Sequence, residues 1–340
     1  MKKRSKYQSI ALLIPLLLVL FILSISLGSV YIPFTDIMDV LMGSANQDNA
    51  HYHIIFSYRL PKALTVVFAG AALGFSGLQM QTLFRNPLAG PFVLGISSGA
   101  SLGVALLVLL GIGVSGTFAY WGMAIASIIG SSIVLLLVVL VSIRLKDSMS
   151  LLLVGLMFGA FTSAIVSIMQ YFSTADDIQN FLFWTFGATG NLSWEELRIF
   201  IPVIIVGIIL GYWQAKPLNA LLMGENYAHS MGLRIQFVRL FLVISTSIMA
   251  GIVTAFCGPI AFLGLAVPHI SRILFKTSNH FILIPATLLL GACLLLICDL
   301  IAQVPNYDLI LPINAVTSLF GAPVVIWLIL RRRNISKNFG

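Results

Sequence analysis

The sequence predicts an all-α polytopic membrane protein with ten transmembrane helices, and three observations support this prediction. Hydrophobic residues make up 59% of the chain and charged residues only 9%, whereas soluble domains carry about 25% charged residues. Several apolar runs exceed the roughly 20 residues that a helix needs to cross a bilayer, and they lack the alternation typical of a membrane β-barrel. The basic residues are also distributed very unevenly between these runs.

The apolar segments follow one another along the whole chain. The first, residues 9–30, comes after the basic start Lys2-Lys3-Arg4-Ser5-Lys6. It is longer than the apolar core of a signal peptide and no small-x-small cleavage site follows, so we expect a retained span. Together the ten spans form one transmembrane domain, residues 1–340. The other nine are predicted at 61–83, 91–111, 118–143, 150–173, 195–215, 233–256, 258–275, 281–304 and 311–331.

The distribution of charge predicts the topology. An even number of spans places both termini on the same side, and if that side is the cytoplasm, only Arg59, Lys62 and Arg198 of the 19 basic residues lie outside. The remaining 16 lie inside, as the positive-inside rule requires. We therefore expect a multi-pass protein of the bacterial cytoplasmic (inner) membrane with both termini in the cytoplasm. The net charge of +8 reflects this topology and contact with anionic membrane lipid, and it does not indicate a nucleic-acid partner.

Two spans are interrupted by glycine and proline. Residues 86–91 (Asn-Pro-Leu-Ala-Gly-Pro) precede the third span, and Gly258-Pro259 opens the eighth. Irregular backbone in a membrane is tolerated only where protein or a water-filled cavity surrounds it. We expect a tight turn at 86–91 and a helix near Gly95–Gly99 that packs on neighbours or faces a pathway; simple helix packing through small residues is the alternative. Paired broken segments of opposite orientation favour inverted-repeat-like halves around a transport pathway.

The longest inner loop, residues 216–235, reads as two short helices. Pro217 suits a helix start and Gly224 its end, and a second helix is expected over about 225–231, before Gly232. Both helices carry apolar residues. The loop is therefore either a docking element for a soluble partner or a helix pair lying on lipid.

Signatures of catalysis and of resident cofactors are missing from the sequence. It contains no P-loop, no Gly-x-Ser-x-Gly and no His-Glu-x-x-His motif. His51 and His53 are too few ligands for a metal, and Asp299, in the ninth span, is expected near the outer end, where a charge costs less. No chain of Asp, Glu and His resembles a proton relay. The cysteines lie in apolar runs without metal-binding spacing: Cys257, Cys293 and Cys298.

Several of these segments together form a recognisable pattern. They are Arg59-Leu60-Pro61-Lys62, Gly70 to Gly77, Asn86-Pro87-Leu88-Ala89, Leu94 to Ala100, Gly224-Glu225, Gly258 to Leu265, Pro268-His269, Leu311-Pro312 and Gly321-Ala322-Pro323. Over nearly the whole chain the sequence resembles the iron-chelate (siderophore), haem and cobalamin family of ABC importer permeases. The resemblance implies the type II ABC importer permease fold and alternating access in an ATP-driven importer, with no enzymatic activity in this chain.

The resemblance also implies partners and site residues. The partners are a second copy of the chain, which makes a homodimer with the pathway on its axis, two ATPase subunits that bind ATP and Mg, and an extracytoplasmic substrate-binding protein; no cofactor is expected on this chain itself. Arg59 and Lys62 match positions that dock the binding protein, and a third such position is Gln303 here. The inner gate is expected at Asn86, Leu88, Ser148 and Met149. Contacts with the ATPase are expected at Leu221, Leu222, Gly224, Glu225, Ala228 and Gly232.

The substrate and one rival function class stay open at this level. A ferric siderophore or related iron chelate is the commoner use of such permeases, with cobalamin and haem as alternatives. A stand-alone ion-coupled secondary transporter is the rival, and it would need an ion-coupling carboxylate such as Asp299. A membrane enzyme lacks any catalytic cluster.

Overall fold

The computed structural model describes residues 8–28, 32–43, 50–110, 117–144, 148–303 and 310–335, and these are almost entirely helical. One isolated antiparallel bridge joins Gln303 and Ile310. In chain order the elements are α2 (Leu13–Ser26), α3 (Phe34–Met42), α4 (Ala50–His53), the π-helix η1 (Ile54–Arg59), α5 (Leu60–Leu83), the 3-10 helix η2 (Pro91–Leu94), α6 (Ile96–Val108), α7 (Thr117–Arg144), α8 (Ser148–Phe172), α9 (Ala175–Phe186), α10 (Trp194–Trp213), α11 (Ala215–Leu221), α12 (Glu225–Ser230), α13 (Ile235–Cys257), α14 (Leu263–Phe275), α15 (His280–Ala302) and α16 (Ile313–Ile335).

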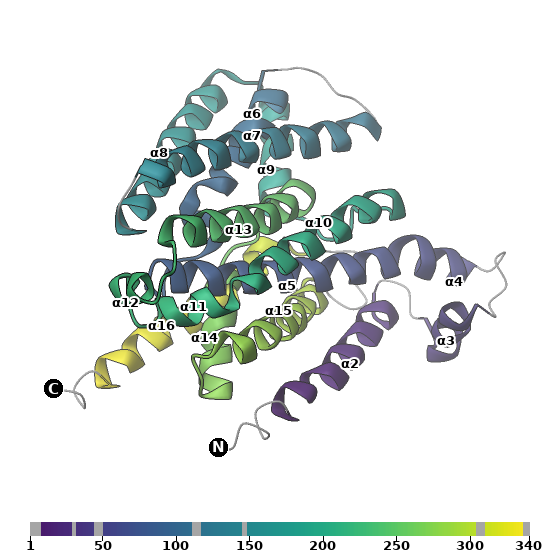
Figure 1. Ribbon diagram of the computed structural model, residues 1–340. Helices are drawn as coiled ribbons and strands as arrows, with labels where there is room; N and C mark the ends of the chain where they lie inside the picture. The colour runs from purple at the N-terminus through teal and green to yellow at the C-terminus, as the bar shows by residue number, and fades with distance from the viewer. Residues whose placement is uncertain are drawn as a thin grey trace.

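A helix lies within each of the ten predicted spans, which confirms an all-α polytopic membrane fold. Seven helical stretches in the described part of the chain are long and apolar enough to cross a membrane. The third, eighth and tenth spans contain shorter apolar helices, Ile96–Val108, Leu263–Phe275 and Ile313–Ile326. In the described ranges the start of α2 and the end of α16 lie at the same end of the molecule as α11 and α12 (Figure 1). We call this the inner end and the opposite one the outer end, following the topology that the sequence predicts.

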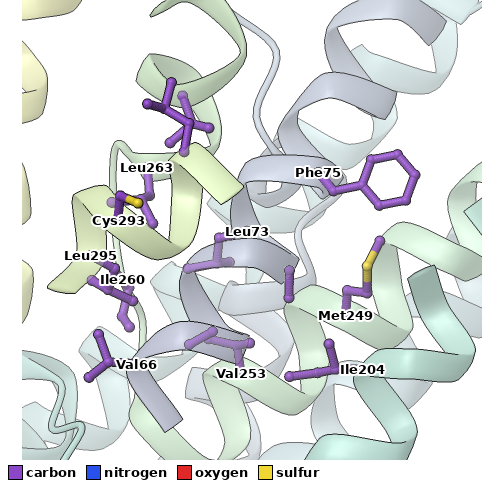
Figure 2. Close-up of a cluster of buried hydrophobic side chains, with 14 of the residues drawn as sticks. Val66, Leu73, Phe75, Ile204, Met249, Val253, Ile260, Leu263, Cys293 and Leu295 are labelled. Carbon is purple, nitrogen blue, oxygen red and sulfur yellow. The ribbon is translucent and has the colours of Figure 1, made fainter. Parts of the chain in front are cut away.

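Helix α5 runs through the centre of the molecule, between α13 and α15 (Figure 1). Glycines allow its neighbours to approach its backbone. Gly70 lies against Gly291 of α15, and Gly77 against Gly264 of α14, so closely that a Cβ at either position of α5 would collide with backbone atoms. Figure 2 shows the side chains that fill the remaining space: Val66, Leu73 and Phe75 of α5, Ile204, Met249 and Val253 of α10 and α13, and Ile260, Leu263, Cys293 and Leu295 of the 258–262 segment, α14 and α15.

The two interrupted spans start later than the sequence predicts, because their first residues are not α-helical. Gly95 adopts a φ of 74°, so the third span begins with η2 and continues as α6 only from Ile96. The eighth span begins as irregular, non-helical backbone at 258–262, where the Asn314 side chain accepts a hydrogen bond from the Ala261 N–H at 3.1 Å. This irregular backbone is surrounded by protein, as expected.

Small residues also join α6 to α7. A Cβ at Gly99 would lie 2.5 Å from Val134 Cγ2 and 2.7 Å from the Gly130 carbonyl oxygen. Gly103 is equally restricted by the backbone of Ala126. The expected close packing of the Gly95–Gly99 region is therefore confirmed, and α6 faces α7 through its glycines.

Four helical elements outside the predicted spans were not expected. Elements α4 and η1 extend α5 into one helical stretch, Ala50–Leu83, of 34 residues. Helices α3 and α9 are short, and α9 begins at a Thr174 cap whose Oγ1 accepts from the Asp177 N–H at 3.3 Å. Both carry acidic residues in the first turn, which breaks the apolar run that marks a span.

Candidate functional site

Helices α11 and α12, with the turn between them, form what we call the coupling segment. Its two helices match the two short helices that the sequence predicts at 216–235. Leu218 and Leu221 of α11 and Ala228 of α12 are almost fully buried, in a cluster that includes Leu83 of α5 and Val238 of α13. Leu221 and Ala228, both predicted to contact an ATPase, therefore fix the segment to the body of the protein.

Glycine at two positions gives the coupling segment its shape. Gly224 has a φ of 113° and Gly232 a φ of 84°, a region that residues with a Cβ rarely adopt. The Gly224 N–H donates to the Leu221 carbonyl at 3.1 Å, and its own carbonyl accepts from the Ala228 N–H at 3.0 Å. One residue thus closes α11 and opens α12.

The side of the coupling segment that points away from the core, with Met231 directly after it, exposes four large apolar side chains beside polar ones such as Asn226 and His229. Leu222 is 36% exposed, Met223 68%, Tyr227 50% and Met231 61%. We call these four residues the coupling surface. Of them, only Leu222 was among the predicted contact residues. Met223 lies in the turn before α12, Tyr227 within α12 and Met231 directly after it, so no single helix face in the sequence predicts the three.

A charged contact connects the coupling segment with α13. Glu225, also a predicted contact residue, has its Oε1 atom 3.5 Å from Nη2 of Arg239. The Arg239 side chain is 1% exposed, whereas that of Glu225 is 29% exposed. A buried guanidinium is costly without a partner, so Glu225 is held at the base of α12.

The predicted turn at 86–91 is present at the end of α5. Arg85 has a left-handed φ of 47°, and the Asn86 side-chain oxygen accepts from the Leu88 N–H at 2.9 Å. This bond is an Asx turn, a local structure that asparagine favours. It leaves Leu88 45% exposed at the inner end. Ser148 and Met149, the other predicted gate residues, form the start of α8, and their side chains lie outside the described part of the structure.

The last two turns of α5 contain polar side chains that the sequence analysis passed over. Gln79 is fully buried, and its amide bonds to the hydroxyls of Ser245 and Thr246 on α13. Gln81 donates to the Leu265 carbonyl of α14 at 3.1 Å and accepts from Arg272. The sequence could have indicated both glutamines, because polar residues within a predicted membrane span are rare and often have a specific role.

The predicted docking residue Arg59 contacts the first span. Its Nη1 atom donates to the carbonyl oxygens of Ile25 at 2.7 Å and Ser26 at 2.9 Å. Ser26 is the last residue of α2. A guanidinium satisfies carbonyls that a helix end leaves without partners, so Arg59 ties the C-terminus of α2 to the start of α5.

The second predicted docking residue, Lys62, forms an ion pair with Asp299. Its Nζ lies 3.3 Å from Asp299 Oδ1, which also accepts from the Thr189 hydroxyl at 2.8 Å. The Gln303 amide donates to the other carboxylate oxygen at 2.7 Å. Asp299 is 1% exposed and lies in the last turn of α15, at the outer end as expected. Its carboxylate therefore joins α5, α15 and the segment after α9.

In the described ranges, no group of three or more His, Cys, Asp or Glu side chains is placed to hold a metal ion. Histidines 51 and 53 are close in sequence, but His51 pairs instead with Asp36 through a 2.5 Å contact. The described structure thus consists of packed helices, an exposed turn at 86–91 and the surface segment of α11 and α12, connected by polar contacts.

Comparisons with known proteins agree with this arrangement. A model of the family described as the FecCD transport family matches residues 16–331. The vitamin B12 import system permease protein BtuC of Salmonella paratyphi A (strain ATCC 9150 / SARB42) is 39% identical over 277 residues, which cover 82% of this chain and 83% of the relative. BtuC of Citrobacter koseri is 39% identical over 279 residues, with the same coverage.

Solved structures give the same result. One described as an inward-facing metal-chelate type ABC transporter has a TM-score of 0.83 and 29% identity, and it covers 95% of this chain and 99% of that one. PsaBC from Streptococcus pneumoniae, solved in complex with Fab, has a TM-score of 0.54 and 16% identity, covering 85% and 94%. At that identity it shares the fold alone.

Proposed function

Since the chain belongs to the FecCD transport family, we propose that it is the membrane subunit of an ATP-driven importer that carries a bulky metal chelate across the inner membrane by alternating access. The coupling surface is the observation that carries this proposal. Four large apolar side chains are presented at one end of the molecule, on a segment fixed to the core beneath them. An apolar patch of this kind is typical of a docking site for another protein.

The partners follow from this role. Two ATPase subunits bind the coupling surfaces of two copies of the chain, and ATP binding draws the ATPases together. The movement enters each permease chain through α11 and α12 and closes or opens the turn at Asn86 and Leu88. Nucleotide hydrolysis belongs to the ATPases, and no residue of this chain performs covalent chemistry.

At the outer end a substrate-binding protein delivers the cargo. Arg59 and Lys62 are the proposed docking residues, and both also make internal contacts. One carboxylate of the binding protein would contact Arg59, which also donates to the carbonyls of α2. Another would contact Lys62, which also pairs with Asp299. Each internal contact keeps a basic side chain oriented, which reduces the entropy lost when the partner binds.

The cargo has three candidates, all of them metal chelates, and haem is the last of the three. An iron chelate such as a ferric siderophore is the first. Cobalamin is the second, and the similarity of this chain to BtuC, a vitamin B12 import permease, favours it. The family makes this chain an ABC importer permease, so the rival of a stand-alone ion-coupled transporter is left without support. The Asp299 carboxylate, on which that rival depends, already has three partners.

Reconstitution tests this proposal directly. The chain is placed in proteoliposomes with the ATPase and the binding protein encoded beside it, and uptake of radiolabelled cyanocobalamin and of a ⁵⁵Fe-labelled hydroxamate siderophore is measured. ATP-dependent uptake of either cargo supports the proposal and identifies the cargo. Uptake by the chain alone, without ATP, would overturn it. Asp299→Asn separates the rival class when uptake is compared per amount of folded protein, because an ion-coupled carrier loses transport whereas the importer keeps ATP-dependent uptake.

A further inference from the structure

A buried hydrogen-bond network connects the coupling segment with the inner end of α5. Thr82 Oγ1 lies 2.9 Å from His280 Nε2, and His280 Nδ1 lies 2.9 Å from Asn219 Oδ1. Thr82 is 2% exposed and His280 is fully buried. The three residues come from three elements, since Asn219 belongs to α11, Thr82 to α5 and His280 to the first turn of α15.

The network determines which atoms donate. Asn219 Oδ1 also accepts from the His280 backbone N–H at 2.8 Å, which identifies this atom as the amide oxygen. An oxygen acceptor requires a proton on the facing ring nitrogen, so Nδ1 carries the single proton of the neutral ring. Nε2 is then an acceptor, and the Thr82 hydroxyl, whose oxygen lies 2.9 Å from both Nε2 and the Leu78 carbonyl oxygen, shares its single proton between these two acceptors. The bond between His280 and Asn219 therefore has one direction, from the ring to the amide oxygen.

The second arm of Asn219 keeps this amide in place. Its Nδ2 donates to Asn279 Oδ1 at 3.2 Å. That same oxygen caps α15 by accepting from the Phe281 N–H at 3.0 Å. A change in the position of α11 thus affects the start of α15 and the His280 ring together, because moving the Asn219 amide away would leave the buried His280 ring without its acceptor.

The position of Thr82 gives the network its functional meaning. Thr82 lies four residues before Asn86, on the last turn of α5, and the Asn86 N–H donates to the neighbouring Gln81 carbonyl at 3.1 Å. The turn that presents Leu88 therefore begins on the piece of helix that His280 holds. Van der Waals packing of Leu218 and Leu221 against Leu83 brings α11 to the same piece of helix, but without a fixed direction.

We propose that Asn219, His280 and Thr82 are positioning residues that transmit displacement of the coupling segment to the gate turn at Asn86 and Leu88. The inference rests on the proposed function, because it requires an ATPase that moves the coupling segment. When the ATPase shifts α11, the Asn219 amide carries His280 with it, and His280 pulls the end of α5. Such coupling is demonstrated only by measuring it.

The experiment reads the gate and the ATPase separately, in the complex with its ATPase partners in lipid nanodiscs. Leu88→Cys, exposed at the gate turn, is alkylated with a water-soluble maleimide with and without ATP. The three native cysteines are buried, so their background labelling is low. In this background Thr82→Val and Asn219→Ala break the network at different bonds. Thr82→Ser retains the hydroxyl, and Thr287→Val is the matched control, since Thr287 is fully buried but bonds only to Ile284 of its own helix.

The expected result is a separation of the two readouts. Thr82→Val and Asn219→Ala reduce the ATP-dependent change in labelling about 2- to 30-fold, the range for residues that mediate coupling, while ATP hydrolysis stays within about twofold. Thr82→Ser and Thr287→Val retain both the ATP-dependent change in labelling and the rate of ATP hydrolysis. If Thr82→Val and Asn219→Ala behave as Thr287→Val does, the inference is wrong although the importer stands. If ATP does not change the labelling of Leu88→Cys in the protein with an intact network, the proposed function itself is wrong. If either Thr82→Val or Asn219→Ala fails to fold, the labelling of the other variant still tests the inference.

Discussion

The two ends of α5 are held by different kinds of interaction. At the outer end Lys62 pairs with Asp299, whose carboxylate also accepts from Thr189 and Gln303. At the inner end Thr82 takes part in hydrogen bonds between neutral groups, through His280 to the coupling segment. Breaking a buried ion pair is strongly destabilising, whereas a single hydrogen bond within a membrane protein contributes about 0.6 kcal/mol. We therefore expect the outer end of α5 to be held more firmly than the inner end.

The largest effect is expected from breaking the outer ion pair. Asp299→Ala leaves the Lys62 charge largely enclosed, with 17% of its side chain exposed, and removes the acceptor of two further hydrogen bonds. We expect a loss of about 3 kcal/mol in the free energy of unfolding, the low end of the range for such pairs, measured by reversible unfolding in detergent.

A double variant provides the control for this prediction. Lys62→Met with Asp299→Leu removes both charges and fills the space with apolar atoms, and such replacements are often neutral or stabilising. We therefore expect it to regain most of the lost stability. If Asp299→Ala costs less than about 1 kcal/mol, the outer end is not held by charge and the contrast between the two ends disappears.

The next effect concerns the contact between Arg59 and the end of α2. Arg59→Met keeps the aliphatic part of the side chain and removes two charge-assisted hydrogen bonds to Ile25 and Ser26. Hydrogen bonds to charged groups contribute about 1.5–3 kcal/mol, and we expect a loss of about 1.5 kcal/mol because part of this side chain is accessible to water. Arg198→Met is the matched control, an exposed basic residue of the same end. Equal stability of the two variants would show that the α2 contact contributes nothing.

A smaller change in stability is expected at the inner end. Thr82→Val preserves the shape of the side chain and removes the hydroxyl that meets His280. We expect a loss of about 0.6 kcal/mol, the average for hydrogen bonds between transmembrane helices, measured in the same detergent. A loss as large as that of Asp299→Ala would mean that the inner end is as rigidly held as the outer end.

The sequence predicts local turns better than it predicts these long-range contacts. Gly224, Gly232 and the Asn86 turn were recognised because their backbone needs residues of specific types, glycine or asparagine, at specific places. Apolar length likewise predicted the spans. It failed only where Gly95 and the 258–262 segment delay the start of a helix.

The contacts of Lys62 and Thr82 could not be predicted from local residue preferences or from apolar length. Lys62 was assigned to docking because it matches a docking position of the family that the sequence resembles, and nothing near it in the sequence points to Asp299. Thr82 and Asn219 are common polar residues whose relation depends on how α5, α11 and α15 pack together. Such partners are brought together by the tertiary fold, not by any local preference.

The smallest effect on stability, with the largest on function, is expected at the coupling surface. Met223→Ser changes a side chain that is 68% exposed, so the free energy of unfolding should shift by no more than about 0.5 kcal/mol. Leu218→Ser, on the buried side of α11, should by contrast destabilise the chain, because it places a hydroxyl in an apolar cluster. Affinity for the ATPase, measured by co-purification and titration, should fall with Met223→Ser. If only Leu218→Ser weakens binding, the apolar face of α11 and α12 lies on lipid, and the inner end has no docking surface at Met223.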